Sequence, residues 1–518
     1  MALGQALPEL SALQTLKISG LTECSDEAVT KLVAAIKHKT LEELELCVTN
    51  LTSTFAESLA QSLPELSALQ TLRVSGLIEC SDEAVTKLVT AIKHQTLKKL
   101  NLSKMNLTSA AAMALGQALP ELSALQTLKI SGLTNCFDEA VAKLVTATKH
   151  KTLEKLQLSE MNLTSAAVVA LGQSLPELPS LQELKISGSD GCTLQLEFPI
   201  LRVLRINDWP EFSMEAVRRL IDVIKHKPLE KLELSKISLT SAVAEALGRL
   251  LPELSALQTL KISGLTECSD EGVTKLVSAI KHKTLEELEL SEIHLTSVAT
   301  EALGQSLPEL SALQTLKISG LTECSYEAVT KLVAAIKHKT LEELELSEIH
   351  LTSVAAEALG QSLPELSALR TLKINGSDEC TLQHKEVEAL FGRFNRPSSL
   401  KELWFTGFTA KGSLAPLTKN LCLFPCLKVL KLEDLDMGEA DLSGLLENLK
   451  FTPDLRSLHL AGNPVGHAVR SMIPYLFEQQ KLEEVYFPPE EFSEENLRYV
   501  QEAVKEKRPR LNFETSWW

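Results

Sequence analysis

The stretch that decides the fold runs from Leu313 to Ala368 and reads LQTLKISGLTECSYEAVTKLVAAIKHKTLEELELSEIHLTSVAAEALGQSLPELSA. It contains two similar halves, 313–340 and 341–368, and the preceding stretch 257–312 repeats the whole of it with only four differences. A fixed period in this range is the signature of a solenoid, in which each repeat is one supersecondary unit. A single unit cannot bury its own apolar face, so the repeats must stack on one another.

Each half opens with the pattern L-x-x-L-x-[LI], as at Leu341, Leu344 and Leu346. Side chains alternate across a β-strand, so Leu344 and Leu346 share one face of a short strand. Glu343 and Glu345 fall on the opposite face and point to solvent. This pattern is the core of a leucine-rich repeat.

A helix is predicted after each strand. In the second half, Thr352 and Ser353 can cap its N-terminus, and Pro364 ends it. In the first half, Ser325 is the candidate N-cap, and acidic residues at the start and basic ones at the end suit the helix dipole. The apolar residues at helical spacing in the second half are Val354, Ala358, Leu359 and Leu363.

Eighteen strand-opening leucines follow one another along the chain from Leu13 to Leu482, mostly at the step that separates Leu313 from Leu341. The predicted fold is therefore α/β: a leucine-rich repeat solenoid, or horseshoe, of about 18 repeats, each roughly 28 residues long. Strands stack about 4.8 Å apart, whereas helix axes need about 8–10 Å. This mismatch predicts parallel strands on the concave face and helices on the convex face.

The repeats predict two regions that differ in character. Residues 1–379 are near-identical tandem repeats, and residues 380–518 are divergent repeats that end in a cap helix over 493–507. Sixteen of the 22 aromatic residues lie in the second region. The repeat at 181–200 is too short to hold a full helix; a deletion during duplication or a local change of curvature accounts for it.

The first twelve residues are identical to residues 113–124, which lie inside a predicted helix. Terminal repeats of a solenoid usually carry a cap. We therefore expect this chain to be the tail of a longer parent or to begin at an internal methionine. A native short form would need another cap.

The charge balance favours protein partners. The chain has 52 basic and 68 acidic residues, a net charge of −16, which disfavours nucleic acid and anionic membranes and suits basic proteins. There is no apolar run of about 18 residues and no signal peptide, so a cytoplasmic location without a membrane span is expected. Seven of the ten cysteines recur at one position of the repeat, which predicts small buried thiols in a reducing compartment.

The sequence shows no catalytic motif. It lacks H-E-x-x-H and G-x-S-x-G, and six histidines recur at predicted helix C-termini, where a structural role is expected. Cys422 and Cys426 with His459 or His467 resemble a zinc set, but their spacing is weak and the repeat pattern puts them on different loops. We therefore predict a non-enzymatic chain without cofactor or metal.

The residue between the second and third apolar positions of each strand faces outward. From Arg205 to Lys373 these residues alternate in charge, which predicts a self-compensated surface of cross-strand pairs. The last four are Trp404, Lys431, His459 and Tyr486, and we predict that they form a column on the concave face that binds protein. The alternative is that Trp404 and Tyr486 shelter the end of the core.

The alternation of two kinds of repeat resembles the ribonuclease-inhibitor-like class of leucine-rich repeats. The recurring sequence LKISGLT…LEELELSEIHLT and the C-terminal sequence LAGNPVG…KLEEVYF resemble the C-terminal repeat region of NLR proteins, the intracellular innate immune receptors. The resemblance implies a ligand-sensing or autoinhibitory region attached to an upstream NACHT module. A stand-alone inhibitor of a basic protein and a regulator of a small GTPase are the alternatives.

Overall fold

The structure, a computed structural model, forms two compact units, Met1–Leu257 and Gln258–Trp518. It describes residues 10–514 except 11, 20–25, 37–39, 48–51, 78–79, 93–95, 106, 134–137, 149–151, 162–173, 188–200, 210–213, 226, 238–239, 266–267, 282–283, 294, 323, 337–339, 378–379, 411–413, 465–468, 487–494, 497, 500–501 and 504–511.

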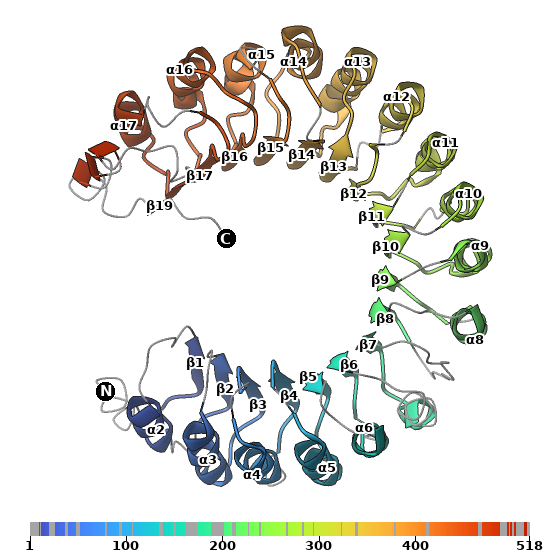
Figure 1. Cartoon of the computed structure of the whole chain (residues 1–518), viewed down its shortest axis with the longest axis vertical. Helices are drawn as coiled ribbons and strands as arrows, with labels where there is room; N and C mark the ends of the chain where they lie inside the picture. Colours follow the sequence, from blue (N-terminus) through green and yellow to red (C-terminus); the bar gives the residue numbers. More distant parts are fainter. Residues whose placement is uncertain are drawn as a thin grey trace. The chain divides into compact units, whose positions relative to one another are not determined.

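The first unit is a parallel sheet whose strands each pair with the next strand in the chain, with helices along one side (Figure 1). Its described strands are β1 (Thr15–Ser19), β2 (Glu43–Cys47), β3 (Thr71–Ser75), β4 (Lys99–Ser103), β5 (Thr127–Leu133), β6 (Lys155–Met161), β7 (Glu183–Ser187), β8 (Val203–Trp209) and β9 (Lys231–Ile237). Its described helices are α2 (Asp26–Ala34), α3 (Ser53–Ser62), α4 (Asp82–Ile92), α5 (Ser109–Ala118), α6 (Asp138–Thr146), α8 (Met214–Ile224) and α9 (Ser241–Leu250).

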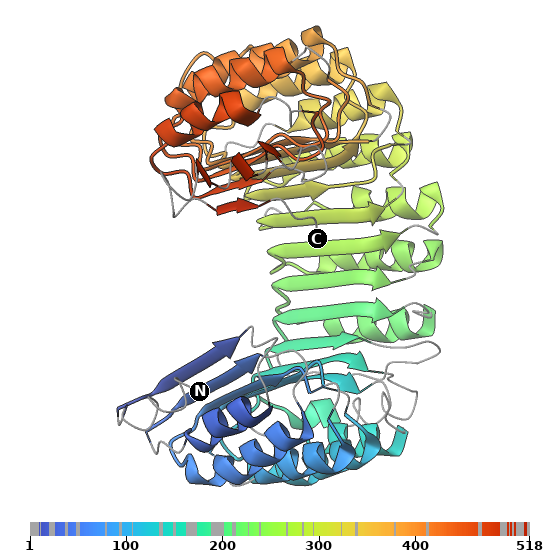
Figure 2. The ribbon, with the colours of Figure 1, turned by 60° about the vertical axis from the view of Figure 1, so that its left-hand side comes forward.

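The second unit repeats this arrangement, and Figure 2 shows its strands side by side and pointing the same way. Its described strands are β10 (Thr259–Leu265), β11 (Glu287–Ile293), β12 (Thr315–Ile318), β13 (Glu343–Ile349), β14 (Thr371–Gly376), β15 (Glu402–Thr406), β16 (Val429–Lys431), β17 (Ser457–His459), β18 (Glu484–Tyr486) and β19 (Asn512–Glu514). Its described helices are α10 (Asp270–Ser278), α11 (Ser297–Ser306), α12 (Tyr326–Ala335), α13 (Ser353–Ser362), α14 (His384–Phe391), α15 (Ala415–Lys419), α16 (Glu439–Asn448) and α17 (Val469–Glu478).

The predicted α/β leucine-rich repeat solenoid is confirmed. Leu316, Leu344 and Leu372 pair across β12, β13 and β14 in one register, so the leucines of successive repeats form continuous buried rows. A fully buried leucine contributes roughly 1.5–3 kcal/mol, which makes these rows the main source of stability. In each unit the strands lie on the inner side and the helices outside (Figure 1). We call the sheet surface that points away from the helices the strand face.

The short repeat keeps its place in the sheet. Strand β8 pairs directly with β7, and Glu183 stands opposite Val203 although the chain between them is shorter than in the other repeats. Residues 188–200, where the helix was expected to be missing, lie outside the described residues. The compact units divide at 257/258, whereas the boundary predicted at 379/380 concerns the similarity of the repeats and stays a prediction.

The helix after Ser325 agrees with the sequence, whereas the apolar face predicted for α13 is partly wrong. The Ser325 hydroxyl accepts a hydrogen bond from the Ala328 amide at 3.2 Å, as expected of an N-cap. In α13, however, Val354 is 62% exposed. The buried residues of α13 are Ala355, Ala356, Leu359, Gly360 and Ser362. Because Val354 precedes this face by about 100° of helical rotation, it points to solvent.

Replacing Thr352 with alanine is expected to lower the free energy of unfolding by about 1 kcal/mol. The Thr352 hydroxyl accepts a hydrogen bond from the Ala355 amide at 3.3 Å at the start of α13. The matched control is Thr330→Ala inside α12, where the hydroxyl donates to the Tyr326 carbonyl of its own helix at 2.7 Å. Urea denaturation measures both, and an equal loss in the two variants would contradict a capping role.

The described cysteines are free thiols. Cys324 and Cys380 are buried, as predicted, and the Cys324 thiol donates to the Leu295 carbonyl at 2.6 Å. Burial raises the pKa of the Cys380 thiol, which keeps it protonated and unreactive. Cys80 and Cys268 are half-buried, whereas Cys24, Cys136 and Cys192 lie outside the described residues.

Strand β19 was not predicted from the sequence. It pairs with β18 through Val485 and Phe513 and so adds a strand to the end of the second unit. The described residues between 495 and 503 are helical, in the region where a closing helix was expected.

Candidate functional site

The four predicted contact residues lie on successive strands at one end of the second unit. Trp404 on β15 stands opposite Lys431 on β16, Lys431 opposite His459 on β17, and His459 opposite Tyr486 on β18. We call Trp404, Lys431, His459 and Tyr486 the C-terminal column. The structure therefore brings all four together.

The leucine-rich pattern places these side chains on the strand face. Leu403 and Phe405, on either side of Trp404, are fully buried in the core. Because side chains alternate along a strand, Trp404 must project the other way. The same alternation turns Lys431, His459 and Tyr486 away from the helices.

The rings of the column already contact neighbouring side chains. The Lys373 ammonium lies 4.4 Å from the centre of the Trp404 ring, and the Lys431 ammonium lies 4.9 Å from it. The His459 and Tyr486 rings stack with centroids 4.1 Å apart and an angle of 11°. Trp404, His459 and Tyr486 are consequently half-buried, although their strand positions face outward as predicted.

A carboxylate holds the middle of the column in place. Glu433 lies 2.7 Å from the Lys431 ammonium and 3.5 Å from His459 Nδ1, and only 16% of its side chain is exposed. His459 Nε2 is 2.8 Å from the Ser457 hydroxyl. Burial alone would raise the pKa of Glu433, but hydrogen bonds from His459 and Lys431 outweigh it and lower that pKa below its ordinary value of 4.5.

The lowered pKa of Glu433 predicts a pH-dependent contribution to stability. A carboxyl whose pKa is lower in the folded state stabilises the fold above pH of about 4.5, and this contribution is lost as the pH falls through the folded pKa. The free energy of unfolding of wild type should therefore fall more steeply below pH 4.5 than that of Glu433→Gln. Denaturant titrations between pH 3 and 7, roughly the window of this linkage, measure the difference. Parallel curves would contradict it.

A cavity of about 240 Å³ opens on the strand face beside Trp404. Lysines, acids and amides from neighbouring strands line it. They include Glu345, Lys373, Asn375, Trp404, Lys431 and Glu433. The Trp404 indole N–H is buried and has no hydrogen-bond acceptor among the described residues. A buried donor without an acceptor costs about 1–3 kcal/mol, so an incoming acceptor would be favoured there.

The strand face upstream of the column has the alternating charges that the sequence predicts. Lys261 pairs with Glu289 at 2.9 Å, and Lys373 pairs with Glu345 at 3.3 Å. Ion pairs at a protein surface contribute only about 0–1 kcal/mol each, and a partner would have to break these half-buried ones. This surface is therefore polar and internally neutralised.

Two residues that matter at the site were not among the predicted contact residues. Lys373 covers one side of Trp404, and Glu433 links Lys431 to His459. Lys373 holds the same strand position one repeat earlier, and Glu433 lies two residues after Lys431. Period-two alternation along the strands could have identified both.

Within the part of the chain that the structure describes, no cluster of histidine, cysteine, aspartate or glutamate side chains is arranged to hold a metal ion. No helix among the described residues is long and apolar enough to cross a bilayer.

No protein-family model matches the chain. Individual proteins are similar to the chain in sequence. Mouse (Mus musculus) ribonuclease inhibitor is 28% identical over 411 residues, which cover 74% of this chain and 86% of the inhibitor. The chain is a leucine-rich repeat protein that resembles ribonuclease inhibitor. Protein NLRC5 of Ictalurus punctatus is 25% identical to this leucine-rich repeat protein over 311 residues, 55% of the chain.

The NLR resemblance extends to a human protein. NACHT, LRR and PYD domains-containing protein 5 of Homo sapiens is 25% identical over 301 residues, 57% of the chain. This leucine-rich repeat protein spans 17% of the length of the NLRC5 relative and 23% of the human one. Its repeats are thus similar both to ribonuclease inhibitor and to NLR proteins.

Proposed function

We propose that this chain is a non-enzymatic protein-binding scaffold, the ligand-sensing or autoinhibitory leucine-rich repeat region of an NLR-like immune receptor in the cytoplasm. The observation that carries the proposal is the C-terminal column beside its cavity. Aromatic rings flanked by cations offer large contact area at a small entropy cost. The main contact with a protein partner lies at this column, and an upstream NACHT module belongs to the parent protein.

The chemistry of the cavity specifies what the partner presents. The Trp404 indole N–H requires an acceptor, and the ring is flanked by Lys373 and Lys431, which are paired with the cavity carboxylates Glu345 and Glu433. A partner side chain that ends in a carboxylate or amide oxygen fits this cavity. The ring faces, which the lysines now cover, become available when such an acceptor draws the ammonium groups away.

A stand-alone inhibitor of a basic protein is the second candidate. The match that covers 86% of mouse ribonuclease inhibitor and the net charge of −16 favour it. Purified chain should then inhibit a basic ribonuclease at nanomolar concentration, and the inhibition should weaken as salt rises. The receptor proposal predicts no inhibition of that enzyme.

The transcript upstream of Met1 tests the receptor proposal. A NACHT module encoded in frame is the expected result, and an in-frame stop codon just before Met1 would contradict it. Affinity purification with the whole chain, followed by calorimetry with the purified candidate, then identifies the partner whose binding to the column can be measured.

A further inference from the structure

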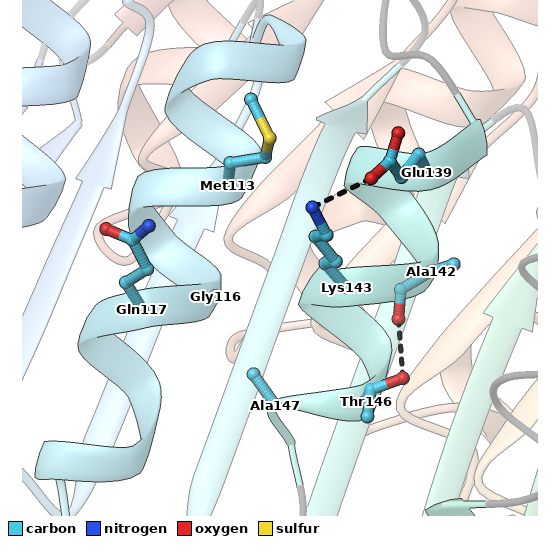
Figure 3. Close-up of a pocket in the computed structure, with 8 residues that line it drawn as sticks. All are labelled: Met113, Gly116, Gln117, Glu139, Ala142, Lys143, Thr146 and Ala147. Atoms are coloured by element: carbon cyan, nitrogen blue, oxygen red, sulfur yellow. Dashed lines mark hydrogen bonds and ion pairs between the residues drawn. The ribbon is translucent and has the colours of Figure 1, made fainter.

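An apolar groove lies on the helix side of the first unit, between α5 and α6 (Figure 3). Its volume is about 450 Å³, within the usual size range of binding pockets. Met113 and Gln117 come from α5, and Glu139, Lys143 and Ala147 come from α6 and the residue after it. Met113 is 38% exposed, although most solvent-facing residues of these helices are polar or small.

The repeats of this chain supply an internal comparison for the groove. At the position of Met113, three sister helices carry a glutamate that reaches across to a basic residue on the next helix. These ion pairs are Glu57 with Lys87 at 3.0 Å, Glu301 with Lys331 at 3.1 Å, and Glu357 with Arg393 at 2.9 Å. Met113 replaces that acid and leaves an apolar surface in its place.

Lys143 therefore differs from its sister lysines. Lys87 and Lys331 each contact two carboxylates, one on the preceding helix and one in their own helix. Among the described residues, Lys143 forms an ion pair only with Glu139 of its own helix, at 2.8 Å. The sister repeats show that a lysine at this position has room for a second carboxylate from the side of the groove.

We propose that the α5–α6 groove binds a helix of another protein that packs an apolar side chain against Met113 and places a carboxylate on Lys143. The carboxylate takes the place that Glu57 and Glu301 take in the sister repeats. The apolar side chain covers Met113, Ala142 and Ala147, and Gly116, where a Cβ would lie 3.4 Å from the Leu144 Cα, lines the groove where α5 and α6 approach each other. Helices commonly recognise such grooves through residues one turn apart.

This surface is separate from the proposed function of the strand face. It lies on the helices of the first unit, whereas the C-terminal column lies on strands of the second. A variant that loses one interaction should therefore keep the other, so failure of either proposal can be recognised independently.

The probe is a library of random helical peptides displayed on phage and selected against the whole chain. Peptides that also bind the Met113→Glu variant are removed by counter-selection. This variant should preserve the fold, because it carries the glutamate found at this position in the sister repeats. Peptides that bind wild type should lose at least tenfold in affinity for Met113→Glu. These peptides should carry an apolar and an acidic residue three or four positions apart. Lys143→Gln should weaken their binding up to about fivefold.

A transplanted groove gives the matched control. In the α11–α12 groove, the triple change Glu301→Met, Thr330→Ala and Ala334→Thr makes the lining residues identical to those between α5 and α6. Calorimetry with a selected peptide should then count two sites per chain in place of one. A single site, an absence of peptides sensitive to Met113→Glu, or selected peptides without an acidic residue would overturn the proposal. Self-association of wild type that Met113→Glu abolishes would assign the groove to a second copy and would also overturn it.

Discussion

Replacing Trp404 with alanine should weaken binding of the protein partner by at least about 2 kcal/mol, which is roughly 30-fold. The indole provides the largest side chain of the C-terminal column, and its buried N–H has no acceptor among the described residues. The change removes this donor and the surface between Lys373 and Lys431. Isothermal calorimetry with the purified partner measures the effect, and Tyr486→Ala should weaken binding in the same way.

The matched control is Glu289→Ala, which alters the same strand position four repeats upstream. Glu289 pairs with Lys261 at 2.9 Å in the self-neutralised part of the strand face, so its loss should change binding little. Stability distinguishes the two interpretations of the aromatic residues. If Trp404→Ala and Tyr486→Ala bind normally but unfold at lower temperature, these rings shelter the end of the core and do not form the contact site.

The second large effect is expected at Asn463, the loop asparagine of LRSLHLAGNPV. Its side chain is fully buried, and the amide oxygen accepts from the Leu435 and Met437 amides, both at 3.1 Å. The amide nitrogen donates to the Leu432 and Leu460 carbonyls at 2.7 and 2.9 Å. Asn463→Ala removes the hydrogen-bond partner of these buried backbone groups and should lower the free energy of unfolding by about 2–4 kcal/mol.

Asn448→Ala is the control for this loss. Asn448 is half-buried at the end of α16, and its side chain donates to the Gly444 carbonyl at 2.7 Å within the same helix. Its replacement should cost less than about 1 kcal/mol, because the freed carbonyl is close to solvent. Guanidinium denaturation of the two variants provides the comparison, and similar losses would refute the special role of Asn463.

The repeat pattern predicted the strands and their register because two simple periods determine them. The constant step between repeats aligns Leu316 with Leu344, and alternation within the strand places Trp404 and Lys431 on one face. The sequence also distinguishes Asn463, because its position is mostly Leu, Ile or Met in the other repeats. These features depend on backbone geometry, which the sequence period specifies directly.

Side-chain packing was not predictable in the same way. The stack of His459 on Tyr486 and the position of Lys373 over Trp404 depend on rotamers. The error at Val354 has a similar cause, since a shift of one residue in a helix turns a side chain by about 100°. The α5–α6 groove depends on a contact between neighbouring repeats. Comparing the repeats at the position of Met113 reveals this contact only once the helix that faces Met113 is known.

The most direct test of the strand-face account is hydroxyl-radical footprinting of the chain with and without its bound partner. Trp404, His459 and Tyr486 are half-buried and oxidisable, so partner binding should reduce the oxidation of all three at once. Tyr326, which is 64% exposed at the start of α12, should keep its rate. Unchanged oxidation of the three column residues in a saturated complex would contradict the account.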